Sequence, residues 1–303
     1  MTADSRGPLI SLMLAVPDAC AAARWYAQAL GATQLWNMGA VVGLRVGQAP
    51  FFLGEPAGNG WDTPATAGTR TARVELFADD PDGVIGQAVA AGADGSIDPV
   101  RDHQMPWGPH RQGGFIDPFG HLWLVGDRSP LSPHPGPAPS PARSDRDPAE
   151  ADRDAAEADR DAARSDHSPM ISHMLAVSDA SAAAGWYARA LGAAELWNLG
   201  SVVGLNAGGA PFFLGEPEGN GWDTPASAGT TTVRVELFAD DPDILIAQAV
   251  ATGAEGSAAD TKDHERPWGV HRQGGFTDPF GHIWLVGDKS PLRPMRGATD
   301  GRS

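Results

Sequence analysis

The stretch GGFIDPFGHLWLVGD at residues 113–127 returns as GGFTDPFGHIWLVGD at residues 274–288. The repeat extends in both directions and joins residues 8–131 to residues 169–292, with equivalent residues 161 positions apart throughout. No insertion or deletion interrupts it. Because every loop keeps its length, the two copies must share one backbone geometry and differ only in side chains.

This duplication predicts two domains, at residues 8–131 and 169–292, which is what a chain of 303 residues can hold. Residues 132–168 are rich in proline and then repeat AEADRDA, without large apolar side chains that could form a core. We therefore predict a disordered linker there and a disordered tail at residues 293–303.

Composition narrows the function classes. The single Cys20 is replaced by Ser181 in the second copy, which excludes an internal disulfide and a duplicated thiol nucleophile. The net charge of −16 argues against nucleic-acid binding, which needs a basic surface. Neither a signal peptide nor a run of about 18 apolar residues occurs, so we expect a cytoplasmic protein without membrane association.

The first copy reads as strand, helix and three strands, twice over. The apolar run at residues 10–16 predicts a buried strand, and Asp18 predicts the cap of a helix that runs through Gln28 and stops at Gly31. The remaining predicted elements are strands at 33–37, 41–46 and 50–53, a strand at 73–77, a helix at 81–91, and strands near Ser96, at 113–116 and at 121–125.

Three segments carry a family resemblance: PDACAAARWYAQALGA (17–32), VELFADDPDGVIGQAVAAGA (74–93) and the stretch at 113–127. With this element order they resemble the PhnB-like branch of the vicinal-oxygen-chelate superfamily, which is of the glyoxalase, bleomycin-resistance and dioxygenase type. The resemblance covers both copies and implies an α+β fold of two tandem domains. Each domain would consist of two βαβββ modules that form a curled, cup-shaped mixed sheet with helices outside.

The same resemblance places up to four metal ligands on strands that face into a cup. In this chain the matching positions hold Ser11, Phe52, Arg73 and Leu124 in the first copy, and Ser172, Phe213, Arg234 and Leu285 in the second. A divalent ion requires imidazole or carboxylate ligands. We therefore expect no metal and no other cofactor, and we expect these residues to contact a ligand instead. His173 is adjacent to one such position, and strand alternation directs it to the opposite face.

Charged pairs occur on one strand of each copy. Arg73 and Glu75, like Arg234 and Glu236, are two residues apart and share a strand face. Two interpretations remain open. The pair is either a buried ion pair that neutralises itself, or a functional pair in which the guanidinium holds a ligand oxygen and the carboxylate accepts a proton.

Aromatic and histidine side chains follow in segments predicted as loops. Trp61 and Trp107 are expected to line the mouth of an aromatic pocket with Phe52, unless they only pin their loops to the domain. His110 is a candidate acid or base because imidazole titrates near neutrality. The second copy repeats the arrangement with Trp222, Trp268, Phe213 and His271.

These observations favour a metal-independent protein that binds a small, partly aromatic molecule, of the sequestration or resistance type. The alternative is a metal-free isomerase, lyase or cyclase in which Glu75, Glu236, His110 and His271 are catalytic, so whether the chain is an enzyme stays open. The mismatched ligand positions disfavour metal-dependent glyoxalase or dioxygenase chemistry. We expect the two domains to pair within the chain, as single-domain relatives pair in dimers.

Overall fold

The computed structural model describes residues 9–58, 60–133, 168–219 and 221–293. Its elements in the first copy are β1 (Leu9–Ala15), α1 (Ala19–Leu30), β2 (Thr33–Asn37), β3 (Val41–Val46), β4 (Ala49–Gly54), α2 (Pro64–Ala67), β5 (Ala72–Phe77), α3 (Pro81–Ala90), β6 (Asp94–Met105), β7 (Gly108–Ile116), β8 (Leu122–Gly126) and the 3-10 helix η1 (Ser129–Leu131). The predicted linker falls largely at residues 134–167 and the predicted tail at 294–303, and both stretches lie outside the described residues.

The second copy repeats this order. Its elements are β9 (Met170–Ala176), α5 (Ala180–Leu191), β10 (Ala194–Asn198), β11 (Val202–Ala207), β12 (Ala210–Gly215), α6 (Pro225–Ala228), β13 (Val233–Phe238), α7 (Pro242–Ala251), β14 (Glu255–Gly256), η2 (Ala258–Asp260), β15 (Lys262–Arg266), β16 (Gly269–Thr277), β17 (Ile283–Gly287) and η3 (Ser290–Leu292). The predicted order of strands and longer helices is therefore confirmed, whereas the short helices α2 and α6, the 3-10 helices and the division into β14 and β15 were not predicted.

Local sequence accounts for the helix ends. The side chain of Asp18 accepts a hydrogen bond from Ala21 N at 2.8 Å, and Gly31 ends α1 with a left-handed φ of 63°. Asp80 and Pro81 begin α3 in the same manner, with Asp80 as the cap and Pro81 in the first turn. Helix α1 thus ends at Leu30, two residues beyond its predicted end at Gln28.

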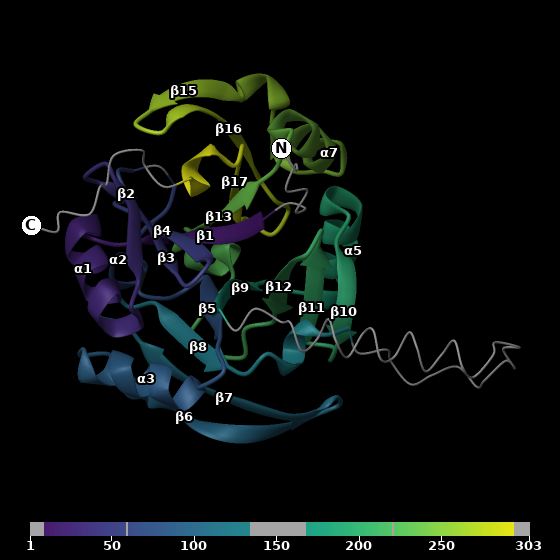
Figure 1. The fold of residues 1–303 in the computed structure, drawn as a ribbon. Coiled ribbons are helices and arrows are strands. Elements are labelled where there is room, and N and C mark those ends of the chain that lie inside the picture. Colours follow the sequence, from purple (N-terminus) through teal and green to yellow (C-terminus); the bar gives the residue numbers. More distant parts are fainter. Residues whose placement is uncertain (1–8, 59, 134–167, 220, 294–303) are drawn as a thin grey trace, which may run out of the picture.

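Two curled mixed sheets form the molecule, and each sheet combines strands from both copies (Figure 1). One has nine strands in the order β14-β16-β17-β13-β1-β4-β3-β2, with β15 paired to β16. The other has eight, in the order β10-β11-β12-β9-β5-β8-β7-β6. The junctions are antiparallel: Ser11 on β1 lies opposite Glu236 on β13, and Glu75 on β5 lies opposite Ser172 on β9.

The α+β fold with two curled sheets is therefore confirmed, while our grouping of cup residues by copy was wrong. The physical reason is the duplication itself. Strands β5 and β13 have nearly the same sequence, so the sequence alone does not say which of them pairs with β1. The division into domains at 8–131 and 169–292 stays a prediction, because the sheets do not follow it.

Helices pair within a copy, although each sheet joins strands of both copies. Helix α1 packs beside α3, where the Trp25 indole donates to Ala91 O at 2.9 Å. Between the copies, Thr71 and its equivalent Thr232 exchange hydrogen bonds: the backbone N of each donates to the hydroxyl of the other, at 3.0 and 2.9 Å. Both threonines are fully buried, so this reciprocal pair marks a local twofold axis.

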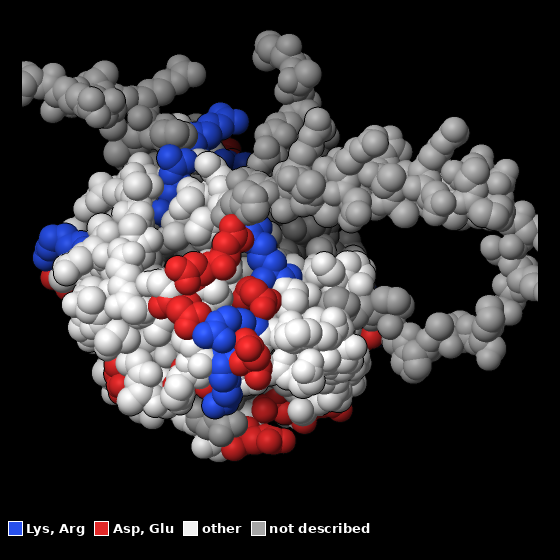
Figure 2. Space-filling model, turned by 60° about the horizontal axis from the view of Figure 1, so that its bottom comes forward, with Lys and Arg blue, Asp and Glu red and all other residues white. Residues whose placement is uncertain are grey.

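Charges on the surface are mixed. On the face in Figure 2, acidic and basic side chains lie side by side in a band, without a broad basic area. On α3 and the β6–β7 hairpin, Arg111 pairs with Asp82 at 2.7 Å and with Asp102 at 3.0 Å. Within the described residues, no helix is both long and apolar enough to cross a membrane.

Candidate functional site

A cavity lies on the inner face of each sheet. We name cup 1 the cavity of the nine-stranded sheet, with a volume of about 270 Å³. Cup 2 is the cavity of the eight-stranded sheet, with a volume of about 210 Å³. Both are lined by strands and hairpins from the two copies, so each cup is complete only when both copies are present.

Stacked aromatic rings form one wall of each cup. In cup 1 the ring of Trp36 lies 4.6 Å from that of Trp268 and 5.6 Å from that of Phe52. In cup 2 the ring of Trp197 lies 5.0 Å from that of Trp107. Trp61 lies in cup 1 with Phe52 and Trp107 lies in cup 2 with Phe213, so the two loop tryptophans of the first copy do not share a pocket. Strands β2 and β10 each contribute a further indole that was not predicted from the sequence. The repeated LWN at residues 35–37 and 196–198 was the available signal.

A buried carboxyl group lies on the inner face of each sheet. Glu75 is 2% exposed and Glu236 is 3% exposed. Burial raises the pKa of each carboxyl to about 8, although the neighbouring arginine lowers it. Both groups are therefore mainly protonated and neutral at pH 7. Within the described structure, the Oε1 atom of each has no hydrogen-bond partner.

The arginines turn towards tryptophans of the other copy. The guanidinium of Arg73 lies 4.1 Å from the ring centre of Trp222, and that of Arg234 lies 4.4 Å from the ring centre of Trp61. Among the described residues, no nitrogen of Arg73 is within 4.0 Å of the Glu75 carboxyl. This arrangement does not support the interpretation as a self-neutralising ion pair for Arg73 and Glu75.

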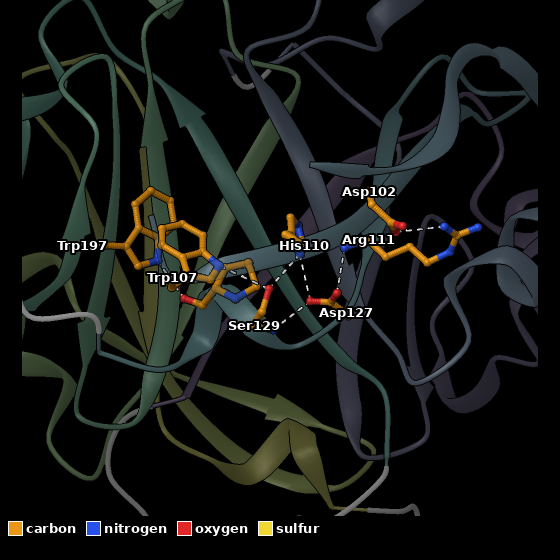
Figure 3. A network of polar contacts seen from close by, with 8 residues as sticks. Asp102, Trp107, His110, Arg111, Asp127, Ser129 and Trp197 are labelled. Carbon is orange, nitrogen blue, oxygen red and sulfur yellow. Dashed lines mark hydrogen bonds and ion pairs between the residues drawn. The ribbon is translucent and has the colours of Figure 1, made fainter. Parts of the chain in front are cut away.

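A histidine at the side of each cup is held by an aspartate, and Figure 3 shows the one in cup 2. In cup 2, Nδ1 of His110 lies 2.9 Å from Asp127 and 3.0 Å from the Ser129 hydroxyl. Burial would raise the pKa of Asp127, but hydrogen bonds from Ser129, Arg111 and His110 lower it to about 2, so this carboxylate is ionised. An ionised partner fixes the proton on Nδ1, which leaves Nε2 as an acceptor.

The equivalent histidine in cup 1 has the same partners. Nδ1 of His271 lies 3.0 Å from Asp288 and 3.1 Å from Ser290. Burial lowers the pKa of His271, against the opposing effect of Asp288. Both the hydroxyl and the carboxylate contact the same ring nitrogen, so neither site has the relay of a hydrolase triad, which uses both nitrogens.

The predicted site residues divide between the cups as follows. Cup 1 is lined by Phe52, Trp61, Arg234, Glu236, Trp268, His271 and Leu285, and cup 2 by Glu75, Trp107, His110 and Phe213. Of the others, Ser11 and Ser172 donate to the carbonyls of Pro50 and Pro211, at 2.5 and 2.6 Å. Leu124 pairs with Glu75, and Arg73 and Trp222 contact each other beside cup 2.

The donor set of the cups does not fit a divalent ion. Across cup 1, Glu236 pairs with Leu285 on one side and Ser11 on the other, and Phe52 pairs with Met13. Besides this carboxyl, His271 lines cup 1, and His103 and His110 line cup 2, but among the described residues these groups do not come together as the three or four ligands that such an ion takes from a protein. In the described part of the chain, no group of three or more His, Cys, Asp or Glu side chains is placed to hold a metal.

Two larger hollows lie outside the cups. One, of about 600 Å³, opens where the first strands of the two copies meet, and the other, of about 690 Å³, lies beside α6. Neither lining, as far as the structure describes it, brings an indole and an imidazole together. We therefore place the candidate site in the cups, where aromatic walls and titratable groups meet.

Comparisons of the sequence match this chain to a family model and to a related protein. A model described as a glyoxalase-like domain matches residues 172–286. An uncharacterized protein of Mycobacterium bovis is 32% identical over 137 residues, which cover 42% of this chain and 86% of that protein.

Solved structures match at the level of the fold. Glyoxalase I from Zea mays superposes with a TM-score of 0.56 at 12% identity, covering 94% of both chains. A putative dioxygenase from Bacillus subtilis gives a TM-score of 0.53 at 12% identity, covering 95% of this chain and 86% of the other. Identity this low relates the folds and leaves the chemistry to be argued from the cups.

Proposed function

We propose, on the premise that this chain belongs to the glyoxalase-like family of the vicinal-oxygen-chelate superfamily, that each cup binds one small, partly aromatic molecule without a metal ion. The role is that of a binding protein, such as one that sequesters its ligand. Cup volumes of about 270 and 210 Å³ favour a compact ligand, since drug-sized ligands occupy ~300–1,000 Å³.

The buried carboxyl group of each cup carries the proposal. A polar atom left without a partner in a protein interior costs about 1–3 kcal/mol. Glu75 and Glu236 each keep such an atom in a cup that is also lined by two indoles in contact, in both cups alike. A protonated carboxyl donates one hydrogen bond and accepts another, so it pairs well with an amide, carbonyl or hydroxyl group of a ligand whose ring lies against the indoles.

Metal-free catalysis is the second candidate, and the histidine supports it. With Nδ1 held by Asp127, Nε2 of His110 is available to accept a proton, and Glu75 lines the same cavity as a protonated acid. Such a pair suits an isomerase or lyase that moves a proton on its substrate.

Two substitutions of the carboxyl separate binding from catalysis. We expect Glu75→Leu with Glu236→Leu to abolish binding and to raise the free energy of unfolding by about 1–3 kcal/mol, because an unpartnered polar group is removed from each cup. Glu75→Gln with Glu236→Gln imitates the protonated carboxyl and should keep binding, but it cannot transfer a proton. Calorimetric titration and thermal melting measure both effects.

The matched control is Asp102→Asn, because Asp102 pairs with Arg111 on the outside of the hairpin. It should change neither affinity nor any activity. Full affinity in the double leucine variant would contradict the proposed function. If the wild-type chain turns over a ligand, both variants should abolish that turnover while the glutamine variant still binds. This outcome would establish metal-free catalysis instead.

Metal content tests the other half of the proposal. Protein purified without chelator should carry well under one equivalent of zinc, nickel, manganese or iron per cup, and EDTA should leave its melting temperature unchanged. Elemental analysis of the purified protein, paired with melting curves before and after EDTA, gives the answer. Stoichiometric metal together with a chelator-sensitive melt would overturn metal independence.

A further inference from the structure

The two cups differ at only two positions among the lining residues that the structure describes. Cup 1 has Met38 and Arg266 where cup 2 has Leu199 and Met105. Every other lining residue of either cup has an identical equivalent in the other copy. Methionine and leucine are similar in size and polarity, so Arg266 is the difference that a ligand can detect.

Arg266 lies at the tip of the β15–β16 hairpin, opposite Gly269, with its side chain partly buried in the lining of cup 1. The ion pairs described for this hairpin join Arg272 to Asp243 and Asp263. Arg266 belongs to none of these pairs, so its charge is available to the cavity. Met105 occupies the same hairpin position in cup 2, opposite Gly108.

The other charged residues in the cup linings have identical equivalents in the other copy. Glu55 beside cup 1 accepts a hydrogen bond from Ala19 N at 3.0 Å, and its equivalent Glu216 accepts one from Ala180 N at 2.9 Å. Arg73, Arg234 and the two buried glutamates are likewise matched between copies. Among the lining residues the net difference is therefore one positive charge on the side of cup 1, while Glu265, which replaces Gln104 beside this position, is exposed and does not line the cup.

From this difference we propose that the two cups take different ligand classes. Cup 1 binds an aromatic molecule that carries an anionic group, such as a carboxylate, which Arg266 contacts. Cup 2 binds the neutral form of such a molecule, because Met105 offers an apolar surface at the same point. This inference rests on the proposed function, since it assigns a ligand class to each of the same two cups.

Matched probes test the proposal directly. Benzoate with benzamide, 1-naphthoate with 1-naphthamide, and indole-3-acetate with indole-3-acetamide each differ by one charge at nearly constant shape. We expect the wild-type chain to bind each acid in cup 1 at least about tenfold tighter than in cup 2. This ratio corresponds to one charge-assisted hydrogen bond. The amides should bind both cups with similar affinity.

Exchanging the two residues should exchange the preference. Arg266→Met should remove the strong acid site and leave the amide unaffected, and Met105→Arg should create a second strong acid site in cup 2. The control is Met38→Leu, which copies the other difference without changing charge and should leave the ratio of acid to amide affinity unchanged. Calorimetric titration at two salt concentrations should show the acid site weakening as salt rises.

The outcomes distinguish the two claims. Equal acid affinity in both cups of the wild-type chain, unchanged by Arg266→Met, would overturn this inference while leaving the proposed function in place. If none of the six probes binds the wild-type chain, the proposed function fails and the inference fails with it. Gain of a strong acid site in Met105→Arg would establish that this hairpin position sets the ligand class.

Discussion

At the scale of single residues, His173 is the most unusual side chain of the core. It is fully buried on β9, its ring lies 6.0 Å from Phe212 and 6.4 Å from Trp284, and neither ring nitrogen has a partner in the described structure. Strand alternation predicted that it would face away from the cup, and the structure confirms this. Its equivalent in the first copy is Leu12, which occupies the same position without a polar atom.

We therefore expect His173→Leu to raise the free energy of unfolding by about 1–3 kcal/mol, because it removes two buried polar atoms without partners. Denaturant unfolding at pH 7 measures the change. The reciprocal control, Leu12→His, should lower stability by a similar amount. A His173→Leu chain that is less stable than wild type would show that the imidazole has a role which the packing does not reveal.

The same residue contributes to the pH dependence of stability. Burial lowers the pKa of His173 in the folded chain to about 3, with a smaller lowering from His282, whereas an unfolded histidine titrates near ~6.5. Between these values the unfolded chain binds the extra proton, so stability falls as pH drops from about 6.5 towards 3. His173→Leu should flatten this acid limb.

The glutamates produce the opposite slope. Their folded pKa of about 8 is higher than that of an unfolded glutamate, ~4.3, so the folded chain binds more protons between these values. Their contribution to stability is complete below the unfolded pKa and is lost as pH rises through 8. Alternation predicted that Arg73 and Glu75 share a face. It could not predict that Arg73 lies over Trp222, which is distant in sequence.

At the scale of elements, a glycine on β3 positions the aromatic wall. Trp36 on β2 lies opposite Gly43, and a Cβ atom there would approach Trp36 Cε2 to 2.5 Å. Gly204 and Trp197 repeat the contact at 2.5 Å in cup 2. Glycine is required because the indole lies flat across the neighbouring strand, a relation that only the register of β2 on β3 reveals.

Gly43→Ala should therefore displace Trp36, lower stability by about 1–3 kcal/mol and abolish ligand binding in cup 1 alone. Gly204→Ala should do the same in cup 2. The control is Gly86→Ala on α3, where no atom lies within 4 Å of the added methyl group and alanine favours the helix. Titration of the three variants measures the number of sites, and two intact sites in Gly43→Ala would contradict this role of the glycine.

The β6–β7 hairpin shows where local sequence was insufficient. The segment MPWGPHRQ (105–112) was predicted as a loop. In the structure β6 continues to Met105 and β7 begins at Gly108, with a two-residue turn between them. Charged and polar side chains on both strands hid the alternation. The hairpin is what brings Met105, Trp107 and His110 to cup 2, and its equivalent brings Arg266, Trp268 and His271 to cup 1.

At the scale of the whole molecule, the duplicated sequence forms two sheets that cross between the copies. Element order could be predicted from the repeat and the turn residues, and the fold class from the family resemblance of the segments at 17–32, 74–93 and 113–127. The strand with which β1 or β9 pairs could not be predicted, because β5 and β13 have nearly the same sequence. The reciprocal hydrogen bonds of Thr71 and Thr232 and the contacts between arginines and tryptophans of opposite copies stabilise the crossed arrangement.

The crossed arrangement of the binding cups is tested most directly by counting sites in two double variants, titrated with 1-naphthamide. Gly43→Ala with Glu236→Leu changes both copies but only cup 1, so one site should remain. Gly43→Ala with Glu75→Leu changes only the first copy but both cups, so no site should remain. If cups formed within copies, the counts would be reversed: no site in the first variant and one in the second.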